Sequence, residues 1–156
     1  MTAAPNRAPF RADHVGSFLR PKELLDAREQ FRTGAITRDA LTAIEDRLIR
    51  DVVKKQEATG IQSITDGDFR RQSWSGDFIT AIGGVRMESP GLRPSQEAAP
   101  AGTVVPDWQP PSPKTFAKMA HPAGGIQTGS FNFLKGLVSK TAKVTIPSPS
   151  MLHFRG

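Results

Sequence analysis

Two carboxylates separated by one glycine, Asp66 and Asp68, are the side chains of this sequence best suited to chemistry. A pair this close can hold a substrate ammonium group, bind a hard cation, or act as acid and base when the surroundings separate the two pKa values. The next residues, FRRQSWSGDF, lack the oxygen ligands of an EF-hand loop, which is therefore excluded. A plainer interpretation is that one aspartate caps a helix while the other pairs with Arg70 or Arg71. Spacing alone does not choose among these interpretations.

The run His14-Val15-Gly16-Ser17 is a second group with chemical potential. A glycine lets a ligand approach the backbone, and a following serine adds a hydroxyl and an N–H group suited to a carboxylate. In α/β folds ligands gather where strands end, which is where we expect this run to lie. Composition alone favours a plainer interpretation, in which Gly16 permits a turn, Ser17 caps the next helix and His14 packs in the interior.

A third group lies near the end of the sequence, in the run IPSPSMLH. Its prolines stiffen a loop, and Ser148, Ser150 and His153 can line a pocket. Trp74 and Trp108 can stack on a flat ligand, although aromatic side chains fill cores more often. The sequence contains no cysteine, which excludes a disulfide framework and any thiolate metal site within these residues.

Two helices are predicted in the first half of the sequence. The first begins at Pro21, carries an apolar stripe and ends at Gly34. Its stripe comprises Leu24, Leu25, Arg28 and Phe31. The second is capped by Thr37 or Asp39 and ends near Gly60. Its apolar positions are Leu41, Ile44, Leu48 and Val52. The charged residues between them, including Glu45 and Asp46, are expected on a solvated face.

Strands are predicted at residues 13–18, 61–69 and 143–146, and one more helix from Ser130 to about Thr141. Strands that alternate with helices indicate an α/β fold with parallel strands. Residues 83–128 are rich in proline and glycine and show no sustained period, so we expect an irregular insertion within a single domain spanning residues 1–156.

The net charge of +6 raises the question of a nucleic-acid partner. Residues 1–80 hold 13 basic and 12 acidic side chains, whereas residues 81–156 hold 8 basic and 3 acidic ones, scattered without a cluster. A solvated surface is the better explanation, and a salt-sensitive DNA titration would test the alternative. No apolar run approaches the roughly 20 residues of a membrane helix, and the first residues lack a secretory signal. We therefore expect a cytoplasmic protein with no nucleic-acid or membrane partner.

Four segments carry a family resemblance: FRADHVGSFLRP, the helix pair ending in KKQEATGI, SITDGDFRRQSWSGDF and KVTIPSPSMLHFRG. Together they resemble the start of the cobalamin-independent methionine synthase family, especially its shorter single-barrel members, related in fold to uroporphyrinogen decarboxylase. The resemblance covers residues 9–80 and 143–156, whereas residues 85–130 match poorly. It implies a TIM (β/α)8 barrel, of which about the first half is present.

The activity that the resemblance implies is methyl transfer from methyltetrahydrofolate to the thiol of homocysteine, giving methionine. In the family a zinc ion binds the thiol as a thiolate, which stays nucleophilic near neutral pH. The family's Gly-Ser contacts the amino acid's carboxylate, and here it corresponds to Gly16 and Ser17. The acidic residue of its glycine-acid-Phe motif holds the ammonium, and here it is Asp68. Methionine synthases of the family usually have glutamate there, which leaves the exact amino acid open.

The resemblance also places several side chains near this pocket without a defined role: His14, Asp66, Arg70, Arg71, Trp74, Ser148 and Ser150. Catalytic residues are not assigned. The family's zinc ligands, a His-x-Cys pair, a Glu and a later Cys, would follow Gly156, so no metal ligand is expected among these residues.

Length is the main departure from the family, since a TIM barrel needs about 250 residues. We therefore expect a truncated product, a fragment, or a chain that self-associates or pairs with a partner half barrel. On this view zinc and homocysteine bind poorly to the chain alone. The alternative function is a non-catalytic half-barrel module for binding or assembly, whose open strand edges and apolar faces need a partner.

Overall fold

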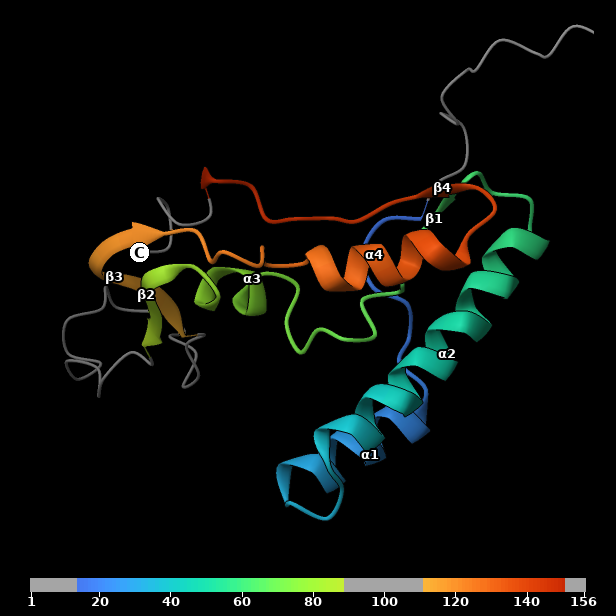
Figure 1. Ribbon diagram of the computed structural model, residues 1–156, viewed down its shortest axis with the longest axis horizontal. Coiled ribbons are helices and arrows are strands. Elements are labelled where there is room, and N and C mark those ends of the chain that lie inside the picture. The colour runs from blue at the N-terminus through green and yellow to red at the C-terminus, as the bar shows by residue number, and fades with distance from the viewer. Residues whose placement is uncertain (1–13, 89–110, 151–156) are drawn as a thin grey trace, which may run out of the picture. The chain divides into compact units, whose positions relative to one another are not determined.

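The computed structural model describes residues 14–88 and 111–150 (Figure 1). These residues divide between two compact units. The first contains residues 14–74 and 127–145, and the second contains residues 75–88, 111–126 and 146–150. Both aspartates of the Asp-Gly-Asp run belong to the first unit.

Helix α1 spans Lys22–Arg32, directly after Pro21, as its missing N–H predicts. It ends at Thr33, and Gly34 follows with a φ of +77°. Leu24 and Ala27 are its buried residues, whereas Leu25 is 51% exposed and Phe31 is 39% exposed. The predicted stripe is therefore wrong at Leu25 and Phe31, because the face that contacts the neighbouring helix is centred on Leu24 and the small Ala27.

Helix α2 spans Arg38–Ala58 and is capped by Thr37, whose hydroxyl accepts a hydrogen bond from the Ala40 amide at 3.2 Å. Gly60, with a φ of +83°, follows its end, as predicted. The buried residues of the helix are Leu41, Glu45, Leu48, Ile49, Val52, Val53 and Gln56. The expected solvated position of Glu45 is wrong, since this side chain is only 1% exposed and sits among the apolar positions.

Strand β1, Ser63–Ile64, pairs in parallel with β4, Thr141–Ala142. Two flanking backbone bonds continue this pairing, from the Thr141 amide to the Gln62 carbonyl at 3.0 Å and from the Lys143 amide to the Ile64 carbonyl at 2.9 Å. The parallel pairing was predicted, but the strand expected at residues 143–146 lies instead at Thr141–Ala142. Residues 14–18 do not form the expected strand either, because a single backbone bond, from Phe18 to Gly67, replaces a ladder.

Helix α4 spans Thr128–Leu137 and begins two residues before the predicted cap, Ser130. No side chain caps it at Gln127, so the capping signal at Ser130 was misleading. The helix contributes the buried Leu134 to the core of the first unit. That core is a single cluster of Leu24, Ala27, Leu41, Leu48, Ile49, Val52, Val53, Ile64, Phe69 and Leu134.

The second unit contains helix α3, Gly76–Thr80, and strands β2, Gly83–Glu88, and β3, Ser112–Ala120, which pair antiparallel. These strands correct the expectation that residues 83–128 are irregular throughout. Strand β3 is exposed along nearly its whole length, with Pro113 as its buried residue. Such a strand has no buried face, so its sequence carries no apolar alternation that could reveal it.

The described residues thus form a mixed α/β structure with two separate two-stranded sheets. The expected first half of a TIM barrel is not confirmed by these small sheets. No helix in the described ranges is both long and apolar enough to cross a membrane.

Candidate functional site

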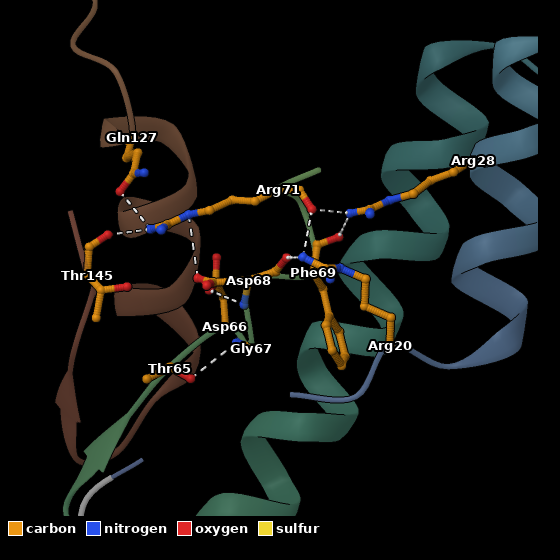
Figure 2. A network of polar contacts seen from close by, with 10 residues as sticks. All are labelled: Arg20, Arg28, Thr65, Asp66, Gly67, Asp68, Phe69, Arg71, Gln127 and Thr145. Carbon is orange, nitrogen blue, oxygen red and sulfur yellow. Dashed lines mark hydrogen bonds and ion pairs between the residues drawn. The ribbon is translucent and has the colours of Figure 1, made fainter. Parts of the chain in front are cut away.

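The loop that leaves strand β1, residues 65–71, carries both aspartates of the candidate site (Figure 2). Every residue from Ser63 to Phe69 is buried. Asp68 has a φ of +58° and is the non-glycine residue with a positive φ among those the structure describes. Since L-residues avoid this region, such an outlier in a buried polar loop indicates a position that the surrounding contacts impose.

Short polar side chains fold this loop onto itself. The Thr65 hydroxyl accepts from the Gly67 amide at 3.1 Å, and Asp66 Oδ1 accepts from the Asp68 amide at 3.0 Å. The Arg71 amide donates to the Asp68 carbonyl at 3.1 Å. Threonine and aspartate hydroxyl or carboxylate groups bond locally to the backbone in this way wherever a chain turns. The sequence therefore determines the turn within the loop.

Gln56 of α2 fixes the start of the loop with both ends of its amide. Its Nε2 donates to the Thr65 carbonyl at 2.8 Å, and its Oε1 accepts from the Thr65 amide at 3.0 Å. The side chain thus bonds Thr65 as a neighbouring strand would, in a buried place where unpaired backbone groups are costly. Sequence reasoning missed Gln56, although it lies four residues after the buried Val52, which is the signal that could have found it.

Arg71 connects the aspartate loop to two other segments of the first unit (Figure 2). Its Nε lies 3.5 Å from Asp68 Oδ1, and its Nη2 donates to Gln127 Oε1 at 2.8 Å and to the Thr145 carbonyl at 2.6 Å. The side chains of Arg71 and Asp68 are 10% and 8% exposed, so this ion pair is shielded from water. The plainer interpretation, that one aspartate pairs with Arg71, is confirmed for Asp68.

The two aspartates differ in their surroundings. Burial raises the pKa of the Asp66 carboxyl above its ordinary value, and the negative charge of Asp68 acts in the same direction. The hydrogen bond from the Asp68 amide and the charges of Arg71 and Arg70 oppose this rise without cancelling it. Asp66 therefore acts as a buried acceptor for the loop backbone, whereas Asp68 forms an ion pair with Arg71.

Two guanidinium groups from the α1 side contact the far end of the loop. Arg20 Nη2 donates to the Arg71 carbonyl at 3.0 Å and to the Asp68 carbonyl at 3.4 Å. Arg28 Nη2 donates to the Phe69 carbonyl at 2.8 Å and to the Arg71 carbonyl at 2.9 Å. Carbonyls of three loop residues thus accept from two side chains more than 40 positions away in sequence.

The segment with His14, Gly16 and Ser17 lies against the same loop. The Phe18 amide donates to the Gly67 carbonyl at 3.2 Å, and the His14 ring stacks on the Phe18 ring with centroids 3.7 Å apart. Gly16 and Ser17 are exposed. The structure thus brings the predicted Gly-Ser beside the predicted acidic loop through Phe18, which sequence reasoning had not singled out.

A hollow beside this segment is lined by His14 and Phe18, by Phe69 and by residues of α2 that include Val52 and Gln56. Asp68 is not among its lining residues. His14 Nε2 is buried without a hydrogen-bond partner among the described residues, which is consistent with the expected packing of this ring.

Arg70 and Trp74 were also predicted near the pocket, and both stay predictions as pocket residues. Arg70 turns toward α2, where it forms ion pairs with Asp46 and, at 3.5 Å, with Glu45, and its guanidinium lies 4.7 Å from the ring centroid of Phe133. The Trp74 side chain is 57% exposed.

Ser148 and Ser150 belong to the second unit and are exposed. Their hydroxyls lie 2.8 Å apart and hydrogen-bond each other. His153 and Trp108 lie outside the described residues. These positions therefore stay predictions as pocket residues.

The described residues do not fit a zinc ion, because no group of three or more His, Asp or Glu side chains in the described ranges could hold a metal, and the sequence has no cysteine. No step of chemistry is assigned to a metal on these residues.

In α/β domains ligands gather beyond the carboxyl ends of parallel strands, which is where this buried acidic loop lies. The family described as "Cobalamin-independent synthase, Catalytic domain" matches residues 10–153. The chain therefore belongs to the cobalamin-independent synthase catalytic-domain family.

Two Bacillus subtilis proteins of uncharacterized function are similar to this chain. YxjH is 36% identical over 159 residues, which cover 98% of this chain and 39% of YxjH. YxjG is 35% identical over 157 residues, which cover 96% of this chain and 38% of YxjG. The chain thus spans about two fifths of the length of the curated relatives it matches.

A crystal structure of a Listeria monocytogenes protein, provisionally described as a vitamin-B12-independent methionine synthase, is similar in fold. It superposes with a TM-score of 0.72 at 38% sequence identity, over 96% of this chain and 39% of that protein. The matched part is again about two fifths of the relative.

Proposed function

We propose that this chain provides the amino-acid side of the site in a methyltransferase of the methionine-synthase type. The reaction is transfer of a methyl group from methyltetrahydrofolate to the sulfur of homocysteine, giving methionine. The carbon–nitrogen bond of the folate breaks, the carbon–sulfur bond forms, and the proton given up by the thiol balances the folate nitrogen. Family membership supports a methyltransferase, and the homocysteine site rests on the residues described below.

The observation that carries the proposal is the buried, internally hydrogen-bonded loop that contains Asp68. A carboxylate has two oxygens and about four acceptor positions, so the contact of Oδ1 with Arg71 leaves capacity for a substrate ammonium. An ion pair with an ammonium is strongest where water is excluded, as around a carboxylate that is 8% exposed. We therefore assign to Asp68 the role of binding the amino group of the substrate.

The carboxylate of the same amino acid is assigned to Gly16 and Ser17. Both residues are exposed, and they precede Phe18, whose amide is tied to Gly67 of the acidic loop. Backbone N–H groups and a hydroxyl are suited to a carboxylate. An α-amino acid carries its two charged groups on one carbon, so a site for it needs an acid and an anion-binding segment side by side.

The wider assignment follows the family. We infer that residues 1–156 belong to one partial TIM-barrel domain in which residues 83–128 form an insertion. We also infer a cytoplasmic protein whose partners are small molecules, homocysteine and a methylated folate, and whose reaction depends on zinc in the family. The described residues offer no zinc ligand set, so the chemistry at sulfur is not assigned to them. The alternative of a non-catalytic assembly module gains no support from the family match.

The test is a titration of the isotope-labelled chain with L-homocysteine, followed by amide chemical shifts, which detect weak binding. We expect the amides of Gly16, Ser17, Gly67 and Asp68 to shift together. The Asp68→Ala variant should weaken homocysteine binding at least about tenfold, the size of one charge-assisted hydrogen bond. Saturating shifts confined to other residues would contradict the proposal.

Two analogues separate the roles of the two sides. Mercaptobutanoate is homocysteine without its amino group, so its binding should not respond to Asp68→Ala. Aminopropanethiol lacks the carboxylate, so its binding should not respond to Ser17→Ala. If Asp68→Ala weakens both homocysteine and mercaptobutanoate equally, Asp68 does not hold the ammonium and the assignment is wrong.

A further inference from the structure

Asp68 has a left-handed backbone conformation, which aspartate tolerates better than most L-residues but adopts less readily than a negative φ. With φ at +58°, the Cβ of a non-glycine residue lies close to the backbone, and such a position persists where the surroundings over-determine it. Glycine, the residue that adopts this conformation freely, could not supply a carboxylate. The question is which groups hold the aspartate there.

The strongest contacts on the far side of Asp68 come from Arg20 and Arg28 (Figure 2). Arg28 bridges the Phe69 and Arg71 carbonyls at 2.8 and 2.9 Å, so two of the three residues that follow Asp68 are held by one guanidinium. Arg20 adds a second donor to the Arg71 carbonyl at 3.0 Å and reaches the Asp68 carbonyl at 3.4 Å. Hydrogen bonds from a charged donor are about twice as strong as neutral ones.

The near side of Asp68 is held locally. The Asp68 amide donates to Asp66, and the carbonyl of Gly67 accepts from Phe18. Those contacts place the entry to the turn. Its exit is held by the local bond from the Arg71 amide to the Asp68 carbonyl and by the guanidinium bonds to the carbonyls of residues 69 and 71. If the guanidinium groups were lost, these carbonyls would have to seek other donors, and Asp68 could relax to a negative φ. Such a relaxation would move the Asp68 carboxylate away from the position proposed to bind the ammonium.

We propose that Arg28, assisted by Arg20, is a positioning residue that holds the Asp68 carboxylate toward the substrate ammonium. This inference rests on the proposed function for the ligand and on the loop geometry for the mechanism. Neither arginine needs to touch the amino acid, because each acts through the backbone of the loop.

Arg32 offers a matched control for Arg28. It lies four residues later on the same helix, and its guanidinium pairs with Glu29 on the exposed surface. Arg28→Gln and Arg32→Gln remove the same charge from the same helix. A general effect of net charge or helix stability would appear in both variants. Loss of the loop contacts, and of the Arg28 charge near the buried Glu45, would appear in Arg28→Gln alone, and Arg28→Lys keeps that charge.

The experiment measures the one-bond coupling between the α-carbon and the α-proton of Asp68, which distinguishes a positive from a negative φ, and the binding of homocysteine and mercaptobutanoate. In Arg28→Gln we expect the coupling to move toward that of a negative φ and homocysteine to bind about tenfold more weakly. Mercaptobutanoate should bind as in the parent chain, because it has no ammonium for Asp68 to hold. A purely structural role would weaken both ligands equally and would overturn the proposal.

A conservative replacement keeps the test informative if Arg28→Gln fails to fold. Lysine retains the charge and can donate to at least one of the two carbonyls, so Arg28→Lys should recover at least half of the lost binding on a logarithmic scale. Arg20→Gln should have the same effect as Arg28→Gln but smaller, because the bonds of Arg20 to the Arg71 and Asp68 carbonyls, 3.0 and 3.4 Å, are longer than the two bonds of Arg28. Failure of Arg28→Lys to exceed Arg28→Gln in binding, or in folding, would contradict the proposal.

The failure of this inference and that of the proposed function are distinguishable. If the parent chain binds no homocysteine, the function fails, while the Asp68 coupling in Arg28→Gln still decides whether the arginine holds the turn. If the parent chain binds homocysteine and Arg28→Gln leaves both the coupling and the affinity unchanged, the positioning role is wrong and the function stands.

Discussion

The two sides of the candidate site are built in different ways. The loop at residues 65–71 is buried almost throughout, and its backbone groups bond to Gln56, Arg20 and Arg28 as well as to one another. The segment at residues 14–19 is largely exposed, with Val15 and Leu19 at 77% and 95% exposure. Its hydrogen bonds include one from the Phe18 amide to the Gly67 carbonyl and one from Lys143 Nζ to the His14 carbonyl at 2.8 Å.

For the proposed amino-acid site, this difference means one side that is already ordered and one side that can adjust. A carboxylate that must attract an ammonium benefits from a rigid, water-poor setting, because the ion pair then needs no reorganisation. A glycine and a serine can bind a carboxylate by donating hydrogen bonds from backbone N–H groups, which can adjust on binding. Substitutions in residues 65–71 should therefore lower the free energy of unfolding strongly, whereas substitutions in residues 14–19 should change it little.

The largest expected effect is that of Arg71→Ala. The substitution removes the cation beside the buried Asp68 carboxylate and the bonds to Gln127 and Thr145. Leaving a buried charge without its partner typically costs about 3 kcal/mol of the free energy of unfolding. Urea denaturation at neutral pH measures this loss. Arg32→Ala, which breaks an exposed pair with Glu29, is the control and should leave the midpoint unchanged. Equal midpoints for the two variants would contradict the comparison.

The second largest effect should come from Gly67→Ala, with Gly16→Ala as its counterpart. Both glycines have a positive φ, +70° and +86°, so both substitutions carry a backbone cost of about 1 kcal/mol. A Cβ on Gly67 would also lie 3.1 Å from the Phe69 ring and 3.2 Å from the Phe18 ring, whereas none of the described atoms lies within 4 Å of one on Gly16. We expect Gly67→Ala to cost about 1 to 2 kcal/mol more, since Phe69 is buried in the core.

Thermal or urea unfolding of the two alanine variants measures that difference directly. Because the backbone cost is common to both, the difference reports packing alone. A Gly16→Ala variant as unstable as Gly67→Ala would mean that the first segment is as tightly packed as the loop, and the comparison would fail.

Removing one hydroxyl from each segment tests the same difference between the two segments, with a smaller expected change in the free energy of unfolding. Thr65→Val keeps the shape of a buried side chain but removes the acceptor of the Gly67 amide, which should cost about 1 kcal/mol. Ser17→Ala acts on an exposed residue and should change the free energy of unfolding by less than about 0.5 kcal/mol. Unfolding curves of both variants under one set of conditions check the order, and a reversed order would contradict it.

The smallest expected effect is a pH dependence at Asp66. Burial raises the pKa of this carboxyl above its ordinary 3.8, so the folded chain holds the proton more tightly than the unfolded chain. Its contribution to stability is therefore largest below 3.8 and falls as the pH rises from there to the raised pKa of the folded state.

Asp66→Asn keeps an oxygen that can accept from the Asp68 amide while removing the charge. The stability of this variant relative to the parent chain should therefore increase as the pH rises through that window. Urea midpoints measured from about pH 3.5 to pH 7 give the trend. A difference that stays constant with pH would show that ionisation of Asp66 is not opposed by the fold.

Much of the first unit follows from the sequence. Pro21 and Thr37 mark the two helix starts, and Gly34 and Gly60 follow the two helix ends, as predicted. The parallel pairing of the strand before Asp66 was also predicted, although its partner lies at Thr141–Ala142 rather than at residues 143–146. Caps and chain reversals depend on bonds within about four residues, which a sequence pattern contains in full.

The sequence singled out the residue types of the candidate site but not the tertiary contacts that hold these residues in place. Asp66, Asp68, Gly16 and Ser17 were singled out, and Phe18 brings their two segments together. Ser148 and Ser150 lie in the other unit, and the sequence placed no strand at Ser112–Ala120, an exposed strand without alternation. A strand or a pocket residue of this kind depends on partners far along the chain, which a local pattern does not contain.

The sequence by itself determined where helices begin and end, which turns carry the aspartates, and which family the motifs resemble. The tertiary structure alone decided that Glu45 is buried, that Arg71 faces Asp68 while Arg70 faces α2, and that Arg28 reaches the Phe69 carbonyl. The reason is physical. Long charged side chains have several acceptors within reach, and the one they take depends on which backbone carbonyls and carboxylates the packed core leaves unpaired.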